Sequence, residues 1–180
     1  MTDFAVPLLN LAQLTLPINP SVADFGAGSG HYALALALRF KQEGQQGQVY
    51  AIDVQKKLLE RIGIEAEREH LTNIRTLWGD LDRLGGSKLA DNSVDAVIVS
   101  NVLFQAEHKD TLLREAYRVC KPSGQLMLVD WSDSYGNLGP TPEMVLPASE
   151  AKRLATSAGW KEVRDFSAGA HHYGIIFKNT

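Results

Sequence analysis

Short runs of apolar residues alternate with segments of helical periodicity along most of the 180-residue chain. Five apolar runs predict strands, at residues 22–25, 48–52, 74–78, 94–100 and 125–130. Four other segments place apolar residues three and four positions apart, as helices do, at residues 31–43, 55–70, 110–120 and 148–158. This alternation predicts an α/β fold, with a doubly wound, mostly parallel sheet and helices on both faces.

The last two apolar runs, residues 160–166 and 173–178, are joined by only a short linker. Parallel strands need a crossover of about a dozen residues or more, so these two predict an antiparallel pair. The sequence has no internal repeat, low-complexity segment or linker, which predicts a single domain over residues 1–180. Residues 81–89 are ambiguous, although Gly85 and Gly86 disfavour a long helix there.

Residues 5–16 predict a short amphipathic helix within an N-terminal segment of residues 1–20. Pro7 suits the first turn of a helix, and Pro17 would end it. Two roles stay open for this helix: it packs against the edge of the sheet, or it forms a lid over a ligand.

Three glycines, Gly26, Gly28 and Gly30, stand at alternate positions between the first apolar run and the first long helix. Glycine lets the backbone approach a ligand closely, and free N–H groups at a helix start bind a carboxylate or a phosphate. Asp24 precedes this turn and Asp53 ends the second apolar run, so both lie at the carboxyl ends of strands. An acid at that place can hold two ribose hydroxyls, which predicts a nucleotide-like ligand. A tight turn that binds nothing is the alternative.

Charge and composition narrow the function only a little. The net charge of −3 gives no electrostatic footprint for duplex nucleic acid and argues against a nucleic-acid partner. The single cysteine, Cys120, excludes an internal disulfide and falls on the apolar face of the 110–120 helix, which predicts a buried thiol. The N-terminus lacks a signal-peptide pattern, and the longest apolar stretch, residues 33–38, is too short to span a bilayer. We therefore expect a cytoplasmic protein.

Several motifs stand in a fixed order: the glycine turn, Asp53, Gly79-Asp80, the run 95–104 and the segment 121–126. Together with the closing antiparallel pair, they resemble the class I, seven-stranded S-adenosylmethionine-dependent methyltransferases from Val22 onward. The resemblance implies a sheet of order 3-2-1-4-5-7-6 in which strand 7 is antiparallel. It also implies S-adenosylmethionine as the cofactor and methyl transfer as the activity.

The resemblance further implies roles for residues at the ends of the first two strands. The three glycines let the backbone run beside the methionine part of the cofactor, and Asp24 lies near its ammonium group. Asp53 accepts both ribose hydroxyls, for which an ionised carboxylate is suited because it only accepts hydrogen bonds. Val54 touches the face of the adenine.

Residues after the third and fourth strands complete this implied set. Asp80 accepts from the adenine amino group with Leu81 beside the ring, and Ser100 and Asn101 face the methionine amine and the acceptor. The cofactor-binding residues expected from the resemblance are Asp24, Gly26, Gly28, Gly30, Asp53, Val54, Asp80, Leu81, Ser100 and Asn101.

The class of acceptor is indicated by the residues that follow the fourth strand. Amino-group methyltransferases of nucleic acids often carry Asn-Pro-Pro-Tyr there, whereas this chain has Asn101-Val102-Leu103-Phe104. This departure and the negative net charge favour a small-molecule acceptor. A protein or a nucleic acid is the alternative.

The linker between the last two strands is the first candidate for contact with the acceptor. The sixth strand ends on the ligand face, so His171, His172 and Tyr173 are expected at the mouth of the site. Histidine titrates near neutrality and is a candidate base, and strand alternation directs only one of the two into the cleft. A surface turn with two incidental histidines is the alternative. No metal is expected, because no cysteine or carboxylate cluster accompanies them.

The connection over residues 131–147 is the second candidate, because an unstructured segment of this length is uncommon unless it has a function. Its side chains Trp131, Asp133, Tyr135 and Met144 are expected to line an acceptor pocket. The chain has little else with which to close a site. The acceptor is therefore expected in an open cleft, held by a partner, or held across a homodimer.

Two other functions stay open on the sequence. Residues 28–33 fit the looser dinucleotide fingerprint, with Asp53 near the place of its acid, which is typical of an NAD-dependent oxidoreductase. Asp24, Gly79-Asp80 and the antiparallel closing pair argue against that interpretation. The other function is a module that binds the cofactor without catalysing a reaction.

Overall fold

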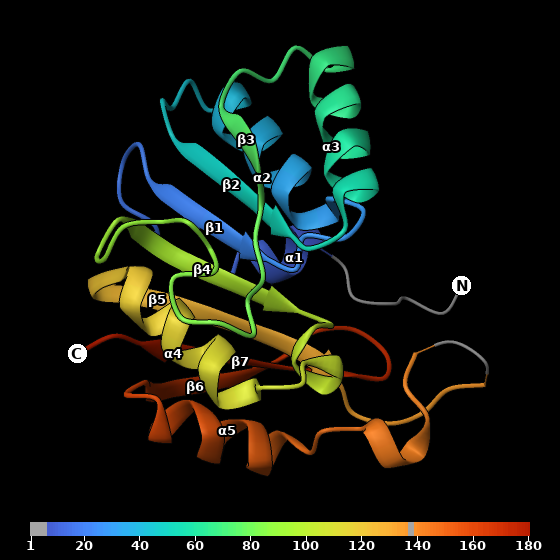
Figure 1. Ribbon diagram of the computed structural model, residues 1–180. Coiled ribbons are helices and arrows are strands. Elements are labelled where there is room, and N and C mark those ends of the chain that lie inside the picture. Colours follow the sequence, from blue (N-terminus) through green and yellow to red (C-terminus); the bar gives the residue numbers. More distant parts are fainter. Residues whose placement is uncertain (1–6, 137–138) are drawn as a thin grey trace.

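The computed structural model describes residues 7–136 and 139–180, and it contains a seven-stranded sheet (Figure 1). The strands are β1 (Ser21–Phe25), β2 (Gln48–Asp53), β3 (Ile74–Trp78), β4 (Val94–Ser100), β5 (Cys120–Trp131), β6 (Lys161–Ser167) and β7 (His172–Lys178). Their order is β3-β2-β1-β4-β5-β7-β6, and β7 runs antiparallel to both of its neighbours. The predicted fold class, strand order and antiparallel closing pair are confirmed.

Helices cover both faces of the sheet (Figure 1). Three helices lie on one face and two on the other: α1 (Pro7–Leu11), α2 (His31–Gln42) and α3 (Lys56–Arg68), then α4 (Lys109–Val119) and α5 (Ala148–Ser157). Their apolar stripes form two core clusters, with Phe40 and Ile62 buried on the first face and Leu113 and Trp160 on the second. Among the described residues, no helix is both long and apolar enough to cross a membrane.

The central position of β4 follows from its composition. It lies between β1 and β5 and carries the most β-branched run of the chain, from Val94 to Val99. Side chains on both of its faces are buried, because helices cover the sheet on both sides. Its carboxyl end is thereby fixed at the middle of the sheet edge that carries the glycine turn.

The first helix is shorter than the sequence pattern predicts. α1 ends at Leu11 rather than at residue 16, and residues 5–6 lie outside the described part of the chain. The backbone N–H of Thr15 donates instead to the side-chain oxygen of Gln125 in β5, at 2.7 Å. Leu16 precedes Pro17, a position that disfavours helical backbone. A contact with a distant strand thus replaces the last helical turn.

Cys120 is buried as predicted, but it begins β5 rather than ending the helix before it. It pairs with Val94, and after an irregularity in the register Ala96 pairs with Gln125. β5 is therefore longer than the predicted 125–130 segment. Burial raises the pKa of the Cys120 thiol to about 12, which keeps the group protonated and fits a place in the core.

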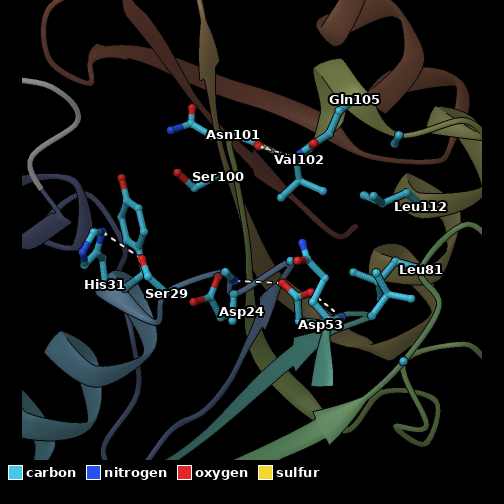
Figure 2. A pocket seen from close by; sticks show the side chains of 18 of the residues that line it. Asp24, Ser29, His31, Asp53, Leu81, Ser100, Asn101, Val102, Gln105 and Leu112 are labelled. Carbon is cyan, nitrogen blue, oxygen red and sulfur yellow. Dashed lines mark hydrogen bonds between the residues drawn. The ribbon is translucent and has the colours of Figure 1, made fainter. Parts of the chain in front are cut away.

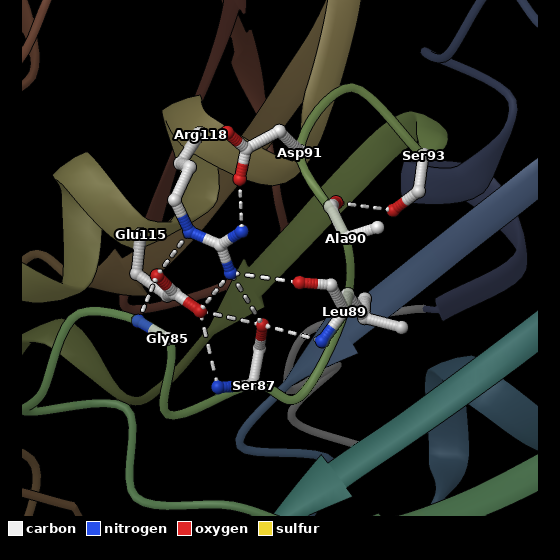
Figure 3. Close-up of polar contacts among 8 residues, drawn as sticks. All are labelled: Gly85, Ser87, Leu89, Ala90, Asp91, Ser93, Glu115 and Arg118. Atoms are coloured by element: carbon white, nitrogen blue, oxygen red, sulfur yellow. Dashed lines mark hydrogen bonds and ion pairs between the residues drawn. The ribbon is translucent and has the colours of Figure 1, made fainter.

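The segment between β3 and β4 forms turns that are held by a buried carboxylate (Figure 3). Glu115 of α4 is fully buried and accepts hydrogen bonds from the Gly85 N–H at 2.7 Å and from the Ser87 hydroxyl at 2.6 Å. Arg118 donates to both carboxylate oxygens, at 2.9 and 2.7 Å. Although burial favours the neutral acid, the hydrogen bonds from Arg118, Ser87 and Gly85 hold the pKa of Glu115 at about 2. This cluster fixes the loop that begins with Gly79 and Asp80.

Candidate functional site

A cavity of about 550 Å³ opens at the carboxyl ends of β1, β2 and β4 (Figure 2). Its walls come from the turns after these strands, the loop after β3, and side chains of α1, α2, α4, β5 and β7. β1 connects through α2 to β2 on one side, whereas its other neighbour, β4, connects through α4 to β5 on the opposite side, so the two connections diverge between the carboxyl ends of β1 and β4. In open α/β sheets, such a switch point is where ligands bind.

The glycines of the turn after β1 serve different purposes. Gly28 has a φ of +54°, lines the cavity, and a Cβ atom there would meet no side chain. Gly26 has a φ of +73°, and a Cβ atom would lie 2.4 Å from Cγ2 of Val102. Gly30 does not line the cavity; a Cβ atom there would lie 2.7 Å from Cγ1 of Ile62 in α3. The structure thus places two of the three glycines at the cavity and the third in helix packing.

Asp24, at the end of β1, lines the cavity although only 2% of its surface is exposed. Its Oδ2 atom is buried and has no hydrogen-bond partner among the described residues. Burial raises the pKa of Asp24 to about 7, and the nearby charge of Asp53 adds to this shift. An unpartnered buried carboxylate is costly, and a cationic N–H donor would satisfy both its charge and its hydrogen bonding.

Asp53, at the end of β2, is oriented by two backbone amides (Figure 2). The Gly28 N–H donates to Oδ2 at 2.9 Å, and the Gln55 N–H donates to Oδ1 at 2.8 Å. These bonds tie the glycine turn to the second strand and fix the plane of the carboxylate. Each oxygen retains a further acceptor position, so the group can accept hydrogen bonds from the two hydroxyls of a diol.

One side of the cavity is apolar. Leu81 and Leu112 lie together at this side in Figure 2, and Val54, which is 57% exposed, also lines the cavity. Asp80 contributes a carboxylate here, which accepts from the Asp82 N–H at 3.2 Å and pairs with a guanidinium on the same loop. An apolar slot with one acceptor group suits a flat heterocycle that carries an amino group.

The end of β4 brings Ser100 and Asn101 into the opposite part of the wall (Figure 2). Asn101 has a φ of +57°, and its N–H donates to the Val129 carbonyl at 2.9 Å. Its Oδ1 atom is buried and has no partner in the described ranges. Left-handed backbone at a residue other than glycine is a strain that often marks functional sites, and here it lies in the cavity wall.

Tyr32 also lines the cavity, and the sequence pattern did not identify its side chain as part of the site. Its hydroxyl accepts a hydrogen bond from Nδ2 of Asn10 at 2.8 Å, and Asn10 also donates to the Ala168 carbonyl at 3.2 Å. The sequence gives little indication of this contact. Tyr32 fits the apolar stripe of α2, and Asn10 is a single polar residue in a buried position. Pro7 lines the cavity too, so α1 contributes to its wall. α1 thus packs against α2 and also lines the cavity, and whether it acts as a lid stays a prediction. Residues 1–6 of this segment lie outside the described residues.

The three candidates from the linker after β6 separate in the structure. His172 lines the cavity, with the ring of Trp131 in β5 tilted against it at 4.2 Å between ring centroids. His171 does not line it; its Nδ1 lies 2.7 Å from an oxygen of Asp133, and its ring stacks on Tyr135. Tyr173 belongs to the other face of the sheet, in the core cluster with α4 and α5. The linker therefore presents one histidine to the cavity.

Of the side chains expected in the 131–147 connection, Trp131 lines the cavity and Asp133, Tyr135 and Met144 do not. Residues 137–138 of this connection lie outside the described residues. Within the described ranges, no three His, Cys, Asp or Glu side chains are grouped as a metal site requires.

Comparison with known proteins assigns the family. A sequence model of the family described as "methyltransferase domain" matches residues 23–128 of the 180. The chain belongs to this family. A solved S-adenosylmethionine-dependent methyltransferase from Aquifex aeolicus superimposes with a TM-score of 0.84 at 28% identity, over 97% of this chain and 89% of that one. The resemblance to the class I methyltransferases is confirmed.

Two curated relatives of this methyltransferase domain are named for different methylation reactions. An arsenite methyltransferase from Aquipseudomonas alcaligenes is 34% identical over 113 residues, which are 61% of this chain and 32% of the relative. The ubiquinone/menaquinone biosynthesis C-methyltransferase UbiE from Hydrogenovibrio crunogenus is 35% identical over 115 residues, 62% of this chain and 42% of the relative. The chain thus spans a third to less than a half of the length of these two relatives.

S-adenosylmethionine is the cofactor of this family, and the cavity of this methyltransferase domain fits it. The buried Oδ2 of Asp24 lacks the cationic partner that an ammonium group supplies. The open space at Gly28 leaves room for a ligand beside the backbone, and the Asp53 carboxylate is fixed in one orientation by backbone amides. A nucleoside with an amino-acid chain therefore matches the donors and acceptors of this wall.

Proposed function

We propose that this chain transfers the methyl group of S-adenosylmethionine to a small-molecule acceptor. The observation that carries the proposal is the meeting of the unpartnered Asp24, the glycine turn and the oriented Asp53 in one cavity. Each has a counterpart on the cofactor, namely the ammonium group, the methionine chain and the ribose diol. The apolar slot at Val54 and Leu81, with Asp80 beside it, would take the adenine.

When bound, the cofactor supplies a methyl group on a positively charged sulfur, which is already a good electrophile. The contribution of the protein is then mainly to position and orient the two reactants, which accounts for much of the acceleration in such displacements. Asp24 and Asp53 hold the ammonium group and the ribose of the cofactor, and the wall formed by Ser100, Asn101 and Tyr32 limits where the acceptor can lie.

A small acceptor is supported by the site and by the charge of the chain. The cavity of about 550 Å³ has to accommodate both cofactor and acceptor, and the net charge of −3 does not favour nucleic acid. Transfer of labelled methyl groups to a metabolite library tests this, with total protein and RNA as the alternative acceptors. Label in protein or RNA but not in metabolites would overturn the small-molecule assignment. The homodimer stays a prediction, to be checked by light scattering with and without cofactor.

Calorimetry of the purified chain should show micromolar binding of S-adenosylmethionine and of S-adenosylhomocysteine, and no binding of NAD. The expectation follows from Asp24, whose unpartnered Oδ2 would meet an ammonium group in the two sulfur compounds, whereas NAD has no ammonium group. Tight NAD binding without a response to either sulfur compound would contradict the assignment and favour an oxidoreductase.

Asp53→Ala should weaken the binding of S-adenosylhomocysteine by about 1.5–3 kcal/mol, the usual range for hydrogen bonds to a charged group. The substitution removes the oriented pair of acceptor oxygens at the end of β2, and it also frees the Gly28 and Gln55 amides. Asp110→Ala, an exposed acid on α4, is the control and should leave the affinity unchanged. A folded Asp53→Ala protein with unchanged affinity would show that the ribose is held elsewhere.

A further inference from the structure

His172 has a buried nitrogen that nothing in the cofactor assignment explains. The residue is 7% exposed and lines the cavity, yet its Nε2 atom has no hydrogen-bond partner among the described residues. Leaving a buried polar atom unpaired destabilises the folded protein, so each such atom in a cavity wall needs a reason. A bound molecule that donates a hydrogen bond would supply one.

The protonation pattern of the His172 ring follows from its other contact. Nδ1 lies 2.8 Å from the carbonyl oxygen of Ala170, which can only accept. Nδ1 therefore carries the hydrogen, and in the neutral ring Nε2 is left with a lone pair. The ring is also held in place by Trp131, whose centroid lies 4.2 Å away at an angle of 39°.

The surroundings of His172 favour the neutral ring. Burial, the largest effect, lowers the pKa of His172, and the nearby His171 lowers it further. The hydrogen bond to the Ala170 carbonyl and the charge of Asp133 raise the pKa, but they do not reverse the shift. The other charged or titratable side chains of the same cavity are on different elements, among them Asp24 on β1 and His31 and Tyr32 on α2. At neutral pH the side chain is therefore available to accept a proton.

The position of His172 in the sheet separates it from the cofactor contacts. It begins β7, which is two strands away from β4 in the order β4-β5-β7, or about 10 Å across the sheet. Asp24 and Asp53 lie on β1 and β2, on the other side of β4. The part of the cavity between Ser100 and His172 is consequently free for the acceptor.

We propose that His172 is the general base of the methyl transfer, with Nε2 accepting a proton from a hydroxyl or N–H acceptor that must be deprotonated to react. The inference rests on the proposed function and narrows its acceptor to a protic class. It also selects one histidine of the adjacent pair, because His171 lies outside the cavity wall and contacts Asp133.

The step balances without a further reactant. The bond between the acceptor and its hydrogen breaks, and the proton goes to Nε2 of His172, which becomes an imidazolium. The electron pair left on the acceptor forms a bond to the methyl carbon, while the carbon–sulfur pair stays on sulfur as a thioether. The imidazolium then releases its proton to water.

The test compares acceptors whose reacting atom must lose a proton with acceptors whose reacting atom already has a free lone pair and carries no proton. The first group is a series of phenols from phenol to 4-nitrophenol, and the second is pyridine, dimethyl sulfide and arsenite, which reacts at arsenic. We expect turnover in the first group. His172→Gln should lower kcat about 100-fold or more, in the range for loss of a general base, with S-adenosylhomocysteine affinity within twofold of the wild type. His70→Asn, an exposed histidine after α3, is the matched control.

If His172 only supported the fold, the loss of kcat in His172→Gln would be the same for acidic and for weakly acidic acceptors. If His172 removes the proton, the loss of kcat in His172→Gln should be largest for phenol and small for 4-nitrophenol, which ionises near neutral pH. Equal losses along the series would overturn the proposal. So would wild-type turnover confined to the second group, no turnover at all, or a loss in His171→Asn that His172→Gln does not show.

NMR of the wild-type protein keeps the proposal testable even if the variant does not fold. At pH 7.5 the His172 ring should show a protonated Nδ1 and an unprotonated Nε2, and the reverse tautomer or a full imidazolium would overturn the assignment. Calorimetry with S-adenosylhomocysteine separates this proposal from the cofactor assignment. Intact binding together with a failed base test rejects only His172, whereas absent binding rejects the proposed function itself.

Discussion

Replacing Glu115 by glutamine should lower the free energy of unfolding by about 3–5 kcal/mol, the range for breaking a buried ion pair at one partner. The groups around its carboxylate are all donors: the N–H groups of Gly85 and Ser87, the Ser87 hydroxyl and two N–H groups of Arg118. A glutamine amide would set its own donors against them and leave Arg118 without its buried counterion (Figure 3). Urea unfolding measures the loss. Glu60→Gln, exposed on α3, is the control and should stay within about 0.5 kcal/mol.

The effect of Glu115→Gln should depend on pH in a defined direction. The pKa of Glu115 is lowered from 4.5 to about 2 in the folded state, so its stabilising contribution is present above pH 4.5 and is lost as pH falls toward 2. The difference between wild type and variant should be complete at pH 7 and shrink across that interval. A constant difference would show that shape, rather than charge, holds the loop before β4.

Hydrophobic periodicity was sufficient to predict the elements whose surroundings are uniform. β4 begins and ends at the predicted residues, because a strand buried along nearly its whole length leaves a continuous apolar signature. β3 also begins and ends as predicted, although only Ile74 and Leu77 of its side chains are partly buried. The pattern failed where a distant group decides the backbone. The end of α1 depends on the Gln125 side chain in β5, and the place of Cys120 depends on pairing with Val94. Neither contact has a local sequence signal.

The candidate site shows the same division between local and distant causes. Strand ends and glycine spacing were enough to single out Asp24 and Asp53, which the structure brings to one cavity. Other features depend on tertiary placement, such as the contact of Gly30 with Ile62. In the sequence, Gly86 predicted only that a long helix is disfavoured. In the structure, its backbone packs so closely that a Cβ atom there would lie 1.7 Å from the Asp80 carbonyl oxygen. Close backbone packing of this kind cannot be derived from residue spacing.

Replacing Asp24 by asparagine should stabilise the ligand-free protein at pH 8 and change its stability little at pH 4. Burial raises the pKa of Asp24 from 3.8 to about 7, so the folded state retains a proton that the unfolded state releases between these values. The cost of ionised Asp24 thus grows as pH rises through this interval and is complete above pH 7, at roughly 4 kcal/mol. Thermal unfolding at the two pH values measures it, with the exposed Asp110→Asn as the control. Equal stability of wild type and variant at pH 8 would show that the buried charge is already compensated.

The same Asp24→Asn substitution should weaken S-adenosylhomocysteine binding by about 1.5–3 kcal/mol, because the unpartnered Oδ2 loses the charge that attracts the ligand's ammonium group. Methylthioadenosine, which carries the same nucleoside without the amino-acid chain, is the matched ligand. Its affinity should be unchanged in Asp24→Asn but reduced in Asp53→Ala. Wild-type affinity for S-adenosylhomocysteine should also fall as pH drops below about 7, since the ammonium then meets a protonated Asp24. Equal losses for both ligands in calorimetry of Asp24→Asn would show a general disturbance of the cavity, and an unchanged affinity for S-adenosylhomocysteine would place its ammonium group elsewhere.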